Sequence, residues 1–372
     1  MRLDRLELRD FRNYEHAELG LAPGLTVVAG PNAAGKTNLL EALYFGCTGR
    51  SPRTANEREL VRRGADVTRV VVEGTAEDGL HRLEVGLEPG QAKRQRVDGH
   101  PVESLVNAAE RPLVSVFLPE RLELVKGPPS GRRAHLDRLV AALWPARGDT
   151  RLAYGRALGQ RNALLARVRS GVASAAGLDA WDAELAGHGA RLIADRREAV
   201  EALAPLFAGH GERLGLAGGP GLGYRPRSRA KEAAELAAEL AERRQADLDR
   251  GFTAHGPHRD ELALQLDGAS LRAYGSQGQQ RVAVLALLFA ERELLAAQRA
   301  RPPLMLLDDV MSELDASRRE LLGELLRDGG QAVVTATEAE HVPGCGENGV
   351  AVARVEAGSV RNAPAGPRRV AA

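Results

Sequence analysis

The stretch that decides the fold is GPNAAGKTN, residues 30–38, which stands between the apolar run LTVVA at 25–29 and the segment LLEALYFG. The spacing G-x-x-x-x-G-K-[ST] of a phosphate-binding loop is met by Gly30, Gly35, Lys36 and Thr37. The apolar run predicts a buried parallel strand, and the apolar spacing of residues 37–46 predicts a helix. Because the loop N–H groups and the positive helix N-terminus both point at a bound anion, this order predicts a phosphate site.

We expect this loop to bind ATP together with Mg²⁺. Lys36 would reach the β- and γ-phosphates, and the Thr37 hydroxyl would be a magnesium ligand. Lysine is rare in this arginine-rich chain, and a compact ammonium suits a phosphate cradle better than a planar guanidinium does. The residues expected around the phosphates are Gly30, Pro31, Asn32, Ala33, Ala34, Gly35, Lys36, Thr37 and Asn38.

Composition points to a globular, cytoplasmic protein. The 372 residues are 44% hydrophobic and 27% charged, and no apolar run reaches the length of a membrane span. The first residues, MRLDRLELRDF, are too charged for a signal peptide. Cys47 and Cys345 form no C-x-x-C pair, so neither a zinc site nor a disulfide framework is expected. We therefore expect no membrane partner.

Positive charge gathers in the first part of the chain. Residues 1–170 carry 27 Lys and Arg against 21 Asp and Glu, and the remainder carries 24 against 29. The basic clusters are Arg58, Arg62, Arg63 and Lys93, Arg94, Arg96. They could bind phosphate, or they could be ordinary surface arginines. Aromatic residues make up only 3% of the chain, so any binding to nucleic acid should depend on backbone charge rather than on base stacking.

The order of patterns predicts an α/β protein with an inserted arm. Residues 1–130 alternate as strands around one helix, and from about residue 131 to 250 the pattern is helical with little strand signal. Ser130 is expected to cap the first arm helix, and the glycines of residues 209–229 to interrupt the arm. Residues 251–360 return to strands and a long apolar helix, and residues 361–372 are expected to be a disordered tail.

The run LMLLDD, residues 304–309, supplies the acids that a nucleotide site needs. A continuous apolar run predicts a buried parallel strand, and carboxylates at its C-terminal end lie where open α/β sheets bind ligands. Asp308 would hold Mg²⁺ with Thr37, and Asp309 would orient the attacking water. The predicted catalytic residues are thus Lys36, Asp308 and Asp309.

Two further segments resemble motifs of ABC-type ATPases. YGSQGQQR, residues 274–281, resembles the signature segment, which implies that Ser276, Gln277, Gly278 and Gln279 contact the nucleotide of a second protomer. SELDASRRE, residues 312–320, resembles the D-loop, with Asp315 at the dimer interface. The order implies an ABC-type P-loop ATPase head of two lobes with a mixed sheet, interrupted by a helical or short coiled-coil arm.

Three other segments are similar to those of the RecF family: LRDFRNY (8–14), FLPERLELVKGPPSGRRAHLD (117–137) and FTAHGPHRDEL (252–262). This resemblance implies a weak, DNA-linked ATPase that dimerises on ATP and binds double-stranded DNA, including single/double-strand junctions. It also implies work with RecO and RecR to load RecA at gaps, in replication, recombinational repair and the SOS response.

Some features depart from the ABC pattern. TATE, residues 335–338, stands where a switch histidine is usual, and Asp309 replaces the usual glutamate. Both predict slow hydrolysis, since water positioning is sensitive to about 1 Å. Another SMC-like ATPase acting on chromatin or breaks stays an alternative, and a transporter nucleotide-binding subunit a weaker one, because the arm and the missing histidine disfavour it.

Several single residues have two readings. Arg132 and Arg133 could contact phosphate or begin a solvated helix. His258 to Asp260 form either a functional brace or, more in keeping with the sequence, a salt-bridged structural turn. Arg50 and Arg53 follow the P-loop helix, which favours a contact with nucleotide or DNA.

Overall fold

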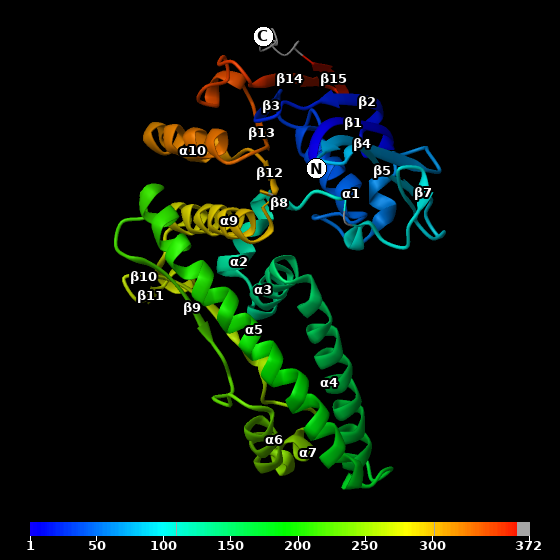
Figure 1. The fold of residues 1–372 in the computed structure, drawn as a ribbon, viewed down its shortest axis with the longest axis vertical. Coiled ribbons are helices and arrows are strands. Elements are labelled where there is room, and N and C mark those ends of the chain that lie inside the picture. Colours follow the sequence, from blue (N-terminus) through cyan, green and yellow to red (C-terminus); the bar gives the residue numbers. More distant parts are fainter. Residues whose placement is uncertain (109, 301, 363–372) are drawn as a thin grey trace. The chain divides into compact units, whose positions relative to one another are not determined.

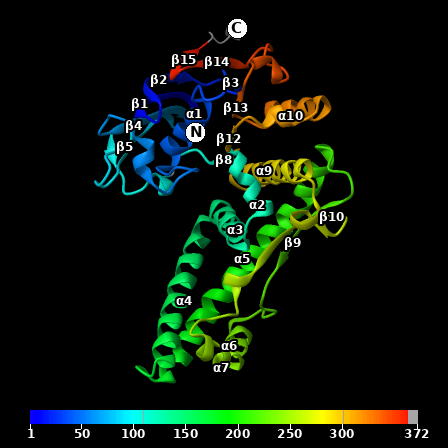
Figure 2. The same ribbon diagram turned by 180° about the vertical axis from the view of Figure 1, so that it is seen from behind.

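The computed structural model describes residues 1–108, 110–300 and 302–362 (Figures 1 and 2). The chain divides into two compact units, of which the first holds Met1–Arg121 and the chain from Leu295 onward and the second holds Leu122–Leu294. These boundaries do not coincide with the predicted divisions at residues 130 and 250. The second unit begins before the predicted arm and continues past it through the signature segment.

The first unit contains an antiparallel sheet of six strands. Their order is β2 (Tyr14–Gly20), β1 (Arg2–Phe11), β4 (Thr68–Ala76), β5 (Gly79–Leu87), β6 (Arg94–Val97) and β7 (His100–Pro101). Buried and more exposed residues alternate along β2 and β6, because successive side chains point to opposite faces. The strands predicted in the first part of the chain are present, and within this sheet they pair antiparallel.

A second sheet of the same unit is mainly parallel. Its order is β15 (Ser359–Asn362), β14 (Ala351–Glu356), β3 (Leu25–Ala29), β13 (Ala332–Ala336), β12 (Leu304–Leu307) and β8 (Val114–Phe117). Every residue of β3, β12 and β13 is buried, as predicted for parallel strands at β3 and β12. Arg361 and Asn362 pair with β14, so their assignment to a disordered tail was wrong. The rest of that predicted tail lies outside the described residues.

Helix α1 (Lys36–Thr48) contacts strands of both sheets, namely β4 and β5 of the first and β13 and β8 of the second. Gly46 permits this close packing, because a Cβ there would lie 2.4 Å from Cγ2 of Val72 in β4. The same unit also contains the 3₁₀ turns η1 (Glu57–Leu60) and η7 (Val310–Glu313) and helix α10 (Ala316–Asp328). Since α1 is fixed from two sides, the loop before it is held by the core.

The second unit is largely helical (Figure 1). Its helices are α2 (Glu123–Lys126), α3 (Pro129–Leu143), α4 (Gly148–Arg169), α5 (Leu178–Arg213), α6 (Ala233–Glu242), α7 (Arg244–Arg250), α8 (Leu271–Tyr274) and α9 (Gln277–Arg299). Helices α4 and α5 pack together as a hairpin. With 36 residues, α5 is about 54 Å long. Across the described residues, every helix is too short or too polar to cross a bilayer.

Two local predictions for this unit were wrong. Residues 220–225 form strand β9 (Pro220–Arg225), which pairs with β10 (Glu261–Leu266), and β10 pairs in turn with β11 (Ala269–Ser270). The partner of β9 lies far along the chain, so local periodicity could not indicate the strand. Helix α3 begins at Pro129 with Pro128 as its N-cap, so Ser130 caps nothing. Proline suits the first helical position because its fixed φ is helical and its missing N–H is not needed there.

Candidate nucleotide-binding site

The loop between β3 and α1 is shaped by its glycines. Gly35 has a φ of +116° at the N-terminus of α1. A Cβ there would lie 2.6 Å from Nδ2 of Asn13, and a Cβ on Gly30 would lie 2.2 Å from the carbonyl oxygen of Val355. Glycine is therefore required at both positions, at one by the left-handed backbone and at both by close packing.

Lys36 lies inside this loop. Its Nζ donates to the carbonyl oxygens of Gly30, at 2.7 Å, and Pro31, at 2.9 Å. Burial lowers the pKa of the Lys36 ammonium from its ordinary value, and the carboxylates of Asp309 and Asp308 act in the opposite direction. The loop therefore gathers one partly desolvated positive charge at its centre.

Thr37 and Asp308 meet, as the sequence predicts for two ligands of one metal ion. The Thr37 hydroxyl lies 2.8 Å from Oδ2 and 3.0 Å from Oδ1 of Asp308. Thr335 also donates its hydroxyl to Oδ1, at 2.7 Å. Sequence reasoning missed Thr335. The available signal was a hydroxyl in the otherwise apolar strand AVVTA, which the parallel register of β12 and β13 places beside Asp308.

These donors fit a magnesium ion. Mg²⁺ prefers hard oxygen ligands, and it commonly takes one or two from protein and the rest from phosphate and water. Asp308 is 7% exposed, and its carboxylate forms no salt bridge with any described residue. Because the carboxylate is contacted by hydroxyls and not by a cationic side chain, its oxygens are suited to a metal ion.

Asp309 turns away from the strand. It has a φ of +46°, and its backbone N–H donates to the Thr335 hydroxyl at 2.8 Å. Its Oδ1 is buried without a hydrogen-bond partner among the described residues. Such an orphaned acceptor is costly unless a donor reaches it. Its predicted role in orienting water stays a prediction.

An asparagine pair braces the loop, and only one member was expected near the site. Asn13 donates from Nδ2 to the carbonyl oxygen of Ala34 at 3.1 Å, and Asn38 donates to Oδ1 of Asn13 at 2.7 Å. Asn13 belongs to the segment LRDFRNY, whose fold-level role the residues alone did not reveal. Gly358 adds a backbone N–H to Ala34 O at 3.2 Å. Two separate parts of the chain, at Asn13 and Gly358, therefore hold the P-loop backbone at Ala34.

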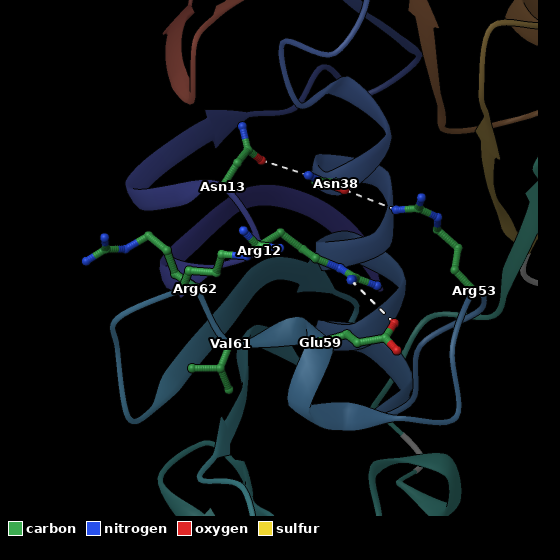
Figure 3. Close-up of a pocket in the computed structure, with 8 residues that line it drawn as sticks. Arg12, Asn13, Asn38, Arg53, Glu59, Val61 and Arg62 are labelled. Carbon is green, nitrogen blue, oxygen red and sulfur yellow. Dashed lines mark hydrogen bonds and ion pairs between the residues drawn. The ribbon is translucent and has the colours of Figure 1, made fainter.

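An arginine-rimmed hollow of about 520 Å³ adjoins the asparagine pair (Figure 3). It is lined by Arg12, Asn13, Asn38, Arg53, Glu59, Val61, Arg62 and Arg63. Arg53 donates to Oδ1 of Asn38 at 3.0 Å, so its guanidinium lies close to the first turn of α1 (Figure 3). Arg12 and Arg62 were not singled out for the nucleotide from the sequence. Their convergence depends on the tertiary fold.

The signature segment in the second unit forms a preorganised helix start. Ser276 and Gln279 form a reciprocal cap, with Ser276 N–H to Gln279 Oε1 at 2.8 Å and Gln279 N–H to Ser276 Oγ at 3.2 Å. Buried Gln280 donates to the carbonyl oxygens of Leu271 and Gly275 at 2.9 and 3.0 Å. Three predicted contact residues are exposed on this support: Ser276, Gln277 and Gly278.

Asp315 caps α10 in its own chain. Its Oδ1 accepts from the backbone N–H of Arg318 at 2.9 Å and from the Ser317 hydroxyl at 2.8 Å. These hydrogen bonds lower the pKa of the Asp315 carboxyl. The carboxylate is therefore held at the surface, and its predicted interface role stays a prediction.

Comparison with known proteins places this geometry in a family. The model of the RecF/RecN/SMC N terminal domain matches residues 2–361. A protein of Anaeromyxobacter sp. (strain Fw109-5), named DNA replication and repair protein RecF, is 41% identical over 97% of this chain and 99% of its own length. The chain belongs to the RecF family. A RecF of Streptomyces avermitilis is 38% identical over 92% of this chain and 95% of its own length. The predicted family is confirmed.

Solved structures confirm the predicted fold class. A structure described as the recombination mediator protein RecF-ATP in the RecFOR pathway aligns with a TM-score of 0.86 and 29% identity, over 97% of each chain. An SMC head bound to the C-terminal winged-helix domain of ScpA aligns with a TM-score of 0.60 at 14% identity, over 98% of this chain and 97% of that one, which shows a shared fold alone.

In the RecF-like segment at residues 117–137, Arg132 has a structural role that the sequence did not predict. Arg132 is 4% exposed and forms a bidentate pair with Glu261 at 2.6 and 3.0 Å. Its Nη1 also donates to the carbonyl oxygens of Leu124, Val125 and Gly127. Both predicted readings of Arg132, a phosphate contact and a solvated helix start, were wrong. The long-range partner Glu261 makes the difference.

The RecF-like segment at residues 252–262 contains a turn around the buried Asp260. Asp260 is fully buried and accepts from Arg196 at 3.2 Å, from the backbone N–H of Arg227 at 2.7 Å and from the Tyr224 hydroxyl. Burial raises the pKa of the Asp260 carboxyl. His258 contacts the Tyr154 hydroxyl at 2.7 Å. This geometry favours the structural turn over a functional brace.

Proposed function

We propose that this chain is an ATP-driven switch that binds double-stranded DNA and acts in replication and recombinational repair. Thr37 and Asp308 carry this proposal, because residues 271 positions apart bring a hydroxyl and an otherwise unpaired carboxylate to 2.8 Å beside a P-loop lysine. Within hydrogen-bond distance this carboxylate meets the hydroxyls of Thr37 and Thr335 and no cationic side chain of the described residues. A magnesium–nucleotide site needs this arrangement.

The P-loop is proposed to cradle the phosphates with Lys36 on the β- and γ-phosphates. The neighbouring hollow then holds the ribose and base, because guanidinium planes such as Arg12 can stack on a base and Asn38 can hydrogen-bond. When bound, Mg²⁺ would neutralise phosphate charge, with Thr37 and Asp308 as its protein ligands. Asp309 would accept a hydrogen bond from the attacking water through its unpartnered Oδ1. Its short side chain makes hydrolysis weak.

Dimerisation is proposed to complete the site. The backbone N–H groups of Gln277 and Gly278 begin α9, and an exposed helix N-terminus of this kind suits the γ-phosphate of a second protomer. Tyr274, two residues before Ser276, is 81% exposed. A large exposed aromatic beside the signature segment is the type of side chain that protein interfaces bury. Asp315 would lie at the same interface.

DNA is proposed to bind through backbone phosphates on the first unit. Arg58, Arg63, Arg94 and Arg96 are exposed there. A second hollow, of about 500 Å³, includes Arg50, Arg53 and Lys93 in its lining. Each phosphate contact should add about 0.9 to the slope of log affinity against log salt. A flat salt dependence on duplex DNA would contradict this part. The protein is further proposed to act in the cytoplasm with RecO and RecR, and to help load RecA at gaps in DNA.

Two inactive variants test the composite site. Ser276→Arg should bind ATP almost normally, since its P-loop is intact, yet neither dimerise nor hydrolyse. Lys36→Met should lose ATP binding or hydrolysis. A mixture of the two should regain turnover, because each heterodimer contains one complete site. ATP affinity, light-scattering mass and turnover are measured for each. A Ser276→Arg protein that still dimerises on ATP would falsify completion in trans.

A further inference from the structure

Glu41, in the second turn of α1, is a fully buried carboxylate beside the arginine-rimmed hollow. Arg12 binds it bidentately, with both contacts at 2.8 Å. Arg53 donates to Oε2 at 3.1 Å, and the Ser51 hydroxyl donates to Oε1 at 2.6 Å. One acid thus receives hydrogen bonds from three side chains on two segments of chain.

The Glu41 cluster continues into the P-loop through hydrogen bonds. Arg53 donates to Glu41 and also to Asn38. Asn38 donates to Asn13, and Asn13 donates to the carbonyl oxygen of Ala34 in the P-loop. Figure 3 shows Asn13, Asn38 and Arg53 in this order along the rim of the hollow.

Burying the Glu41 carboxylate costs free energy, which its hydrogen-bond partners must offset. An isolated buried carboxylate is strongly unfavourable, and here charge-assisted hydrogen bonds offset that cost. The same carboxylate separates and neutralises two guanidiniums that would otherwise repel each other. Glu41 therefore holds the guanidiniums of Arg12 and Arg53, two of the residues that line the hollow. Since Glu41 has no exposed surface, it acts on a ligand through those arginines.

We propose that Glu41 is a positioning residue that fixes Arg12 and Arg53 at the nucleotide hollow and braces the P-loop through Asn38 and Asn13. This inference rests on the proposed nucleotide site. Glu41 would not touch the nucleotide itself, and it would contribute to nucleotide affinity through the two arginines.

The first test is Glu41→Gln, which keeps the shape and removes the charge. We expect ATP with Mg²⁺, measured by equilibrium dialysis, to bind roughly ten- to one-hundredfold more weakly. The matched control is Asp182→Asn. Asp182 is also a buried carboxylate with two arginine partners, Arg161 and Arg244, but it belongs to the second unit. The Asp182→Asn protein should be less stable than the wild type but bind ATP with the same affinity.

A double-mutant cycle separates positioning from general damage. Arg53→Met removes one arginine through which Glu41 acts, so Glu41→Gln should weaken binding much less in that background than in the wild type. Equal effects in both backgrounds would mean that Glu41 does not act through Arg53, and would overturn the inference. Full additivity is also what a purely structural role predicts.

Two outcomes remain distinguishable. If the wild type itself binds no ATP, the proposed function fails. If the wild type binds and folded Glu41→Gln binds equally well, only the positioning role fails. If Glu41→Gln does not fold, Ser51→Ala and Arg53→Met decide. Ser51→Ala removes a neutral donor to Glu41. Each of the two variants should weaken ATP binding, and their effects should not add in the double variant. Wild-type ATP affinity in both single variants would overturn the inference.

Discussion

Asp308 in the first unit and Asp182 in the second are both buried acids, but their partners differ. Asp182 accepts from Arg161 at 2.6 Å and from Arg244 at 2.6 Å. Asp308 accepts only from the hydroxyls of Thr37 and Thr335 and pairs with no cation among the described residues. The acid of the arm has its counter-charge built into the fold. The acid of the P-loop corner forms no such ion pair within the described residues, although its charge acts on the Lys36 ammonium.

This difference separates a structural charge from a functional one. Arg161 is fully buried and also contacts Asp247 and Thr253, so α4, α5 and α7 are joined by ion pairs. A buried charge that is paired within the chain contributes to one defined packing. A buried charge that is left unpaired indicates a ligand of opposite sign. The following experiments test that distinction.

The largest expected effect is at Lys36. Lys36→Met should lower ATP turnover by roughly 10²–10³-fold, because its ammonium stabilises charge on the transferred phosphate. Lys231, an exposed lysine of the second unit, provides the control. Lys231→Met should leave turnover unchanged. Turnover and circular dichroism are measured together, and near-normal turnover in folded Lys36→Met would remove the P-loop assignment.

The two acids should respond in opposite ways. Asp182→Asn leaves Arg161 and Arg244 short of counter-charge, and we expect it to lower the free energy of unfolding by about 3–5 kcal/mol. Asp308→Asn breaks no ion pair, so unfolding should change little while Mg²⁺-dependent ATP binding is lost. Urea titration and ATP dialysis are run on both variants. Equal destabilisation by the two substitutions would contradict the distinction between a structural and a functional buried acid.

Sequence reasoning reached this corner only in part, for a physical reason. Gly35, Lys36, Thr37 and Asp308 are fixed by local patterns, a loop spacing and an acid after a buried strand. Thr335 was missed because it becomes a partner only through the register of two parallel strands.

The same limit explains the other misses. Arg132, its partner Glu261 and strand β9 depend on contacts between segments far apart in the chain. Glu41 reads locally as one more polar residue in a helix, and only the fold brings Arg12 and Arg53 to it. Patterns with a short period were predictable, whereas ion pairs closed by tertiary structure were not.

A third prediction concerns the unpartnered oxygen of Asp309. Asp309→Asn should bind ATP normally and hydrolyse it at least about tenfold more slowly, since positioned proton acceptors contribute to that step. The variant should then accumulate as an ATP-held dimer. Sedimentation with ATP checks this, and Glu184→Gln, at an exposed acid of α5, serves as a control that leaves the acceptor in place. A monomer that binds ATP normally would contradict the role.

The smallest expected effect concerns His258 in the second unit and depends on pH. Burial lowers the pKa of His258 to about 4, against an ordinary value of 6.5. Its two ring nitrogens contact the Tyr154 hydroxyl and the carbonyl oxygen of Thr253, which suits the neutral ring. The folded chain therefore binds fewer protons than the unfolded chain between these two pH values, so stability falls as pH drops through 6.5 and levels off below 4.

The loss at His258 should be about 1.4 kcal/mol per pH unit within that window. His258→Gln can still accept from Tyr154 and donate to Thr253, and it does not titrate. The difference in unfolding free energy between wild type and variant, from urea titrations at about pH 7 and about pH 5, should reach roughly 2 kcal/mol. Subtraction removes the opposing contribution of Asp260, whose raised pKa favours the folded chain in acid. ATP affinity should not differ between the two proteins at either pH, because His258 lies in the second unit and does not line the proposed nucleotide hollow. A pH-independent difference would show that the pKa of His258 is the same in the folded and the unfolded chain, and would contradict this prediction.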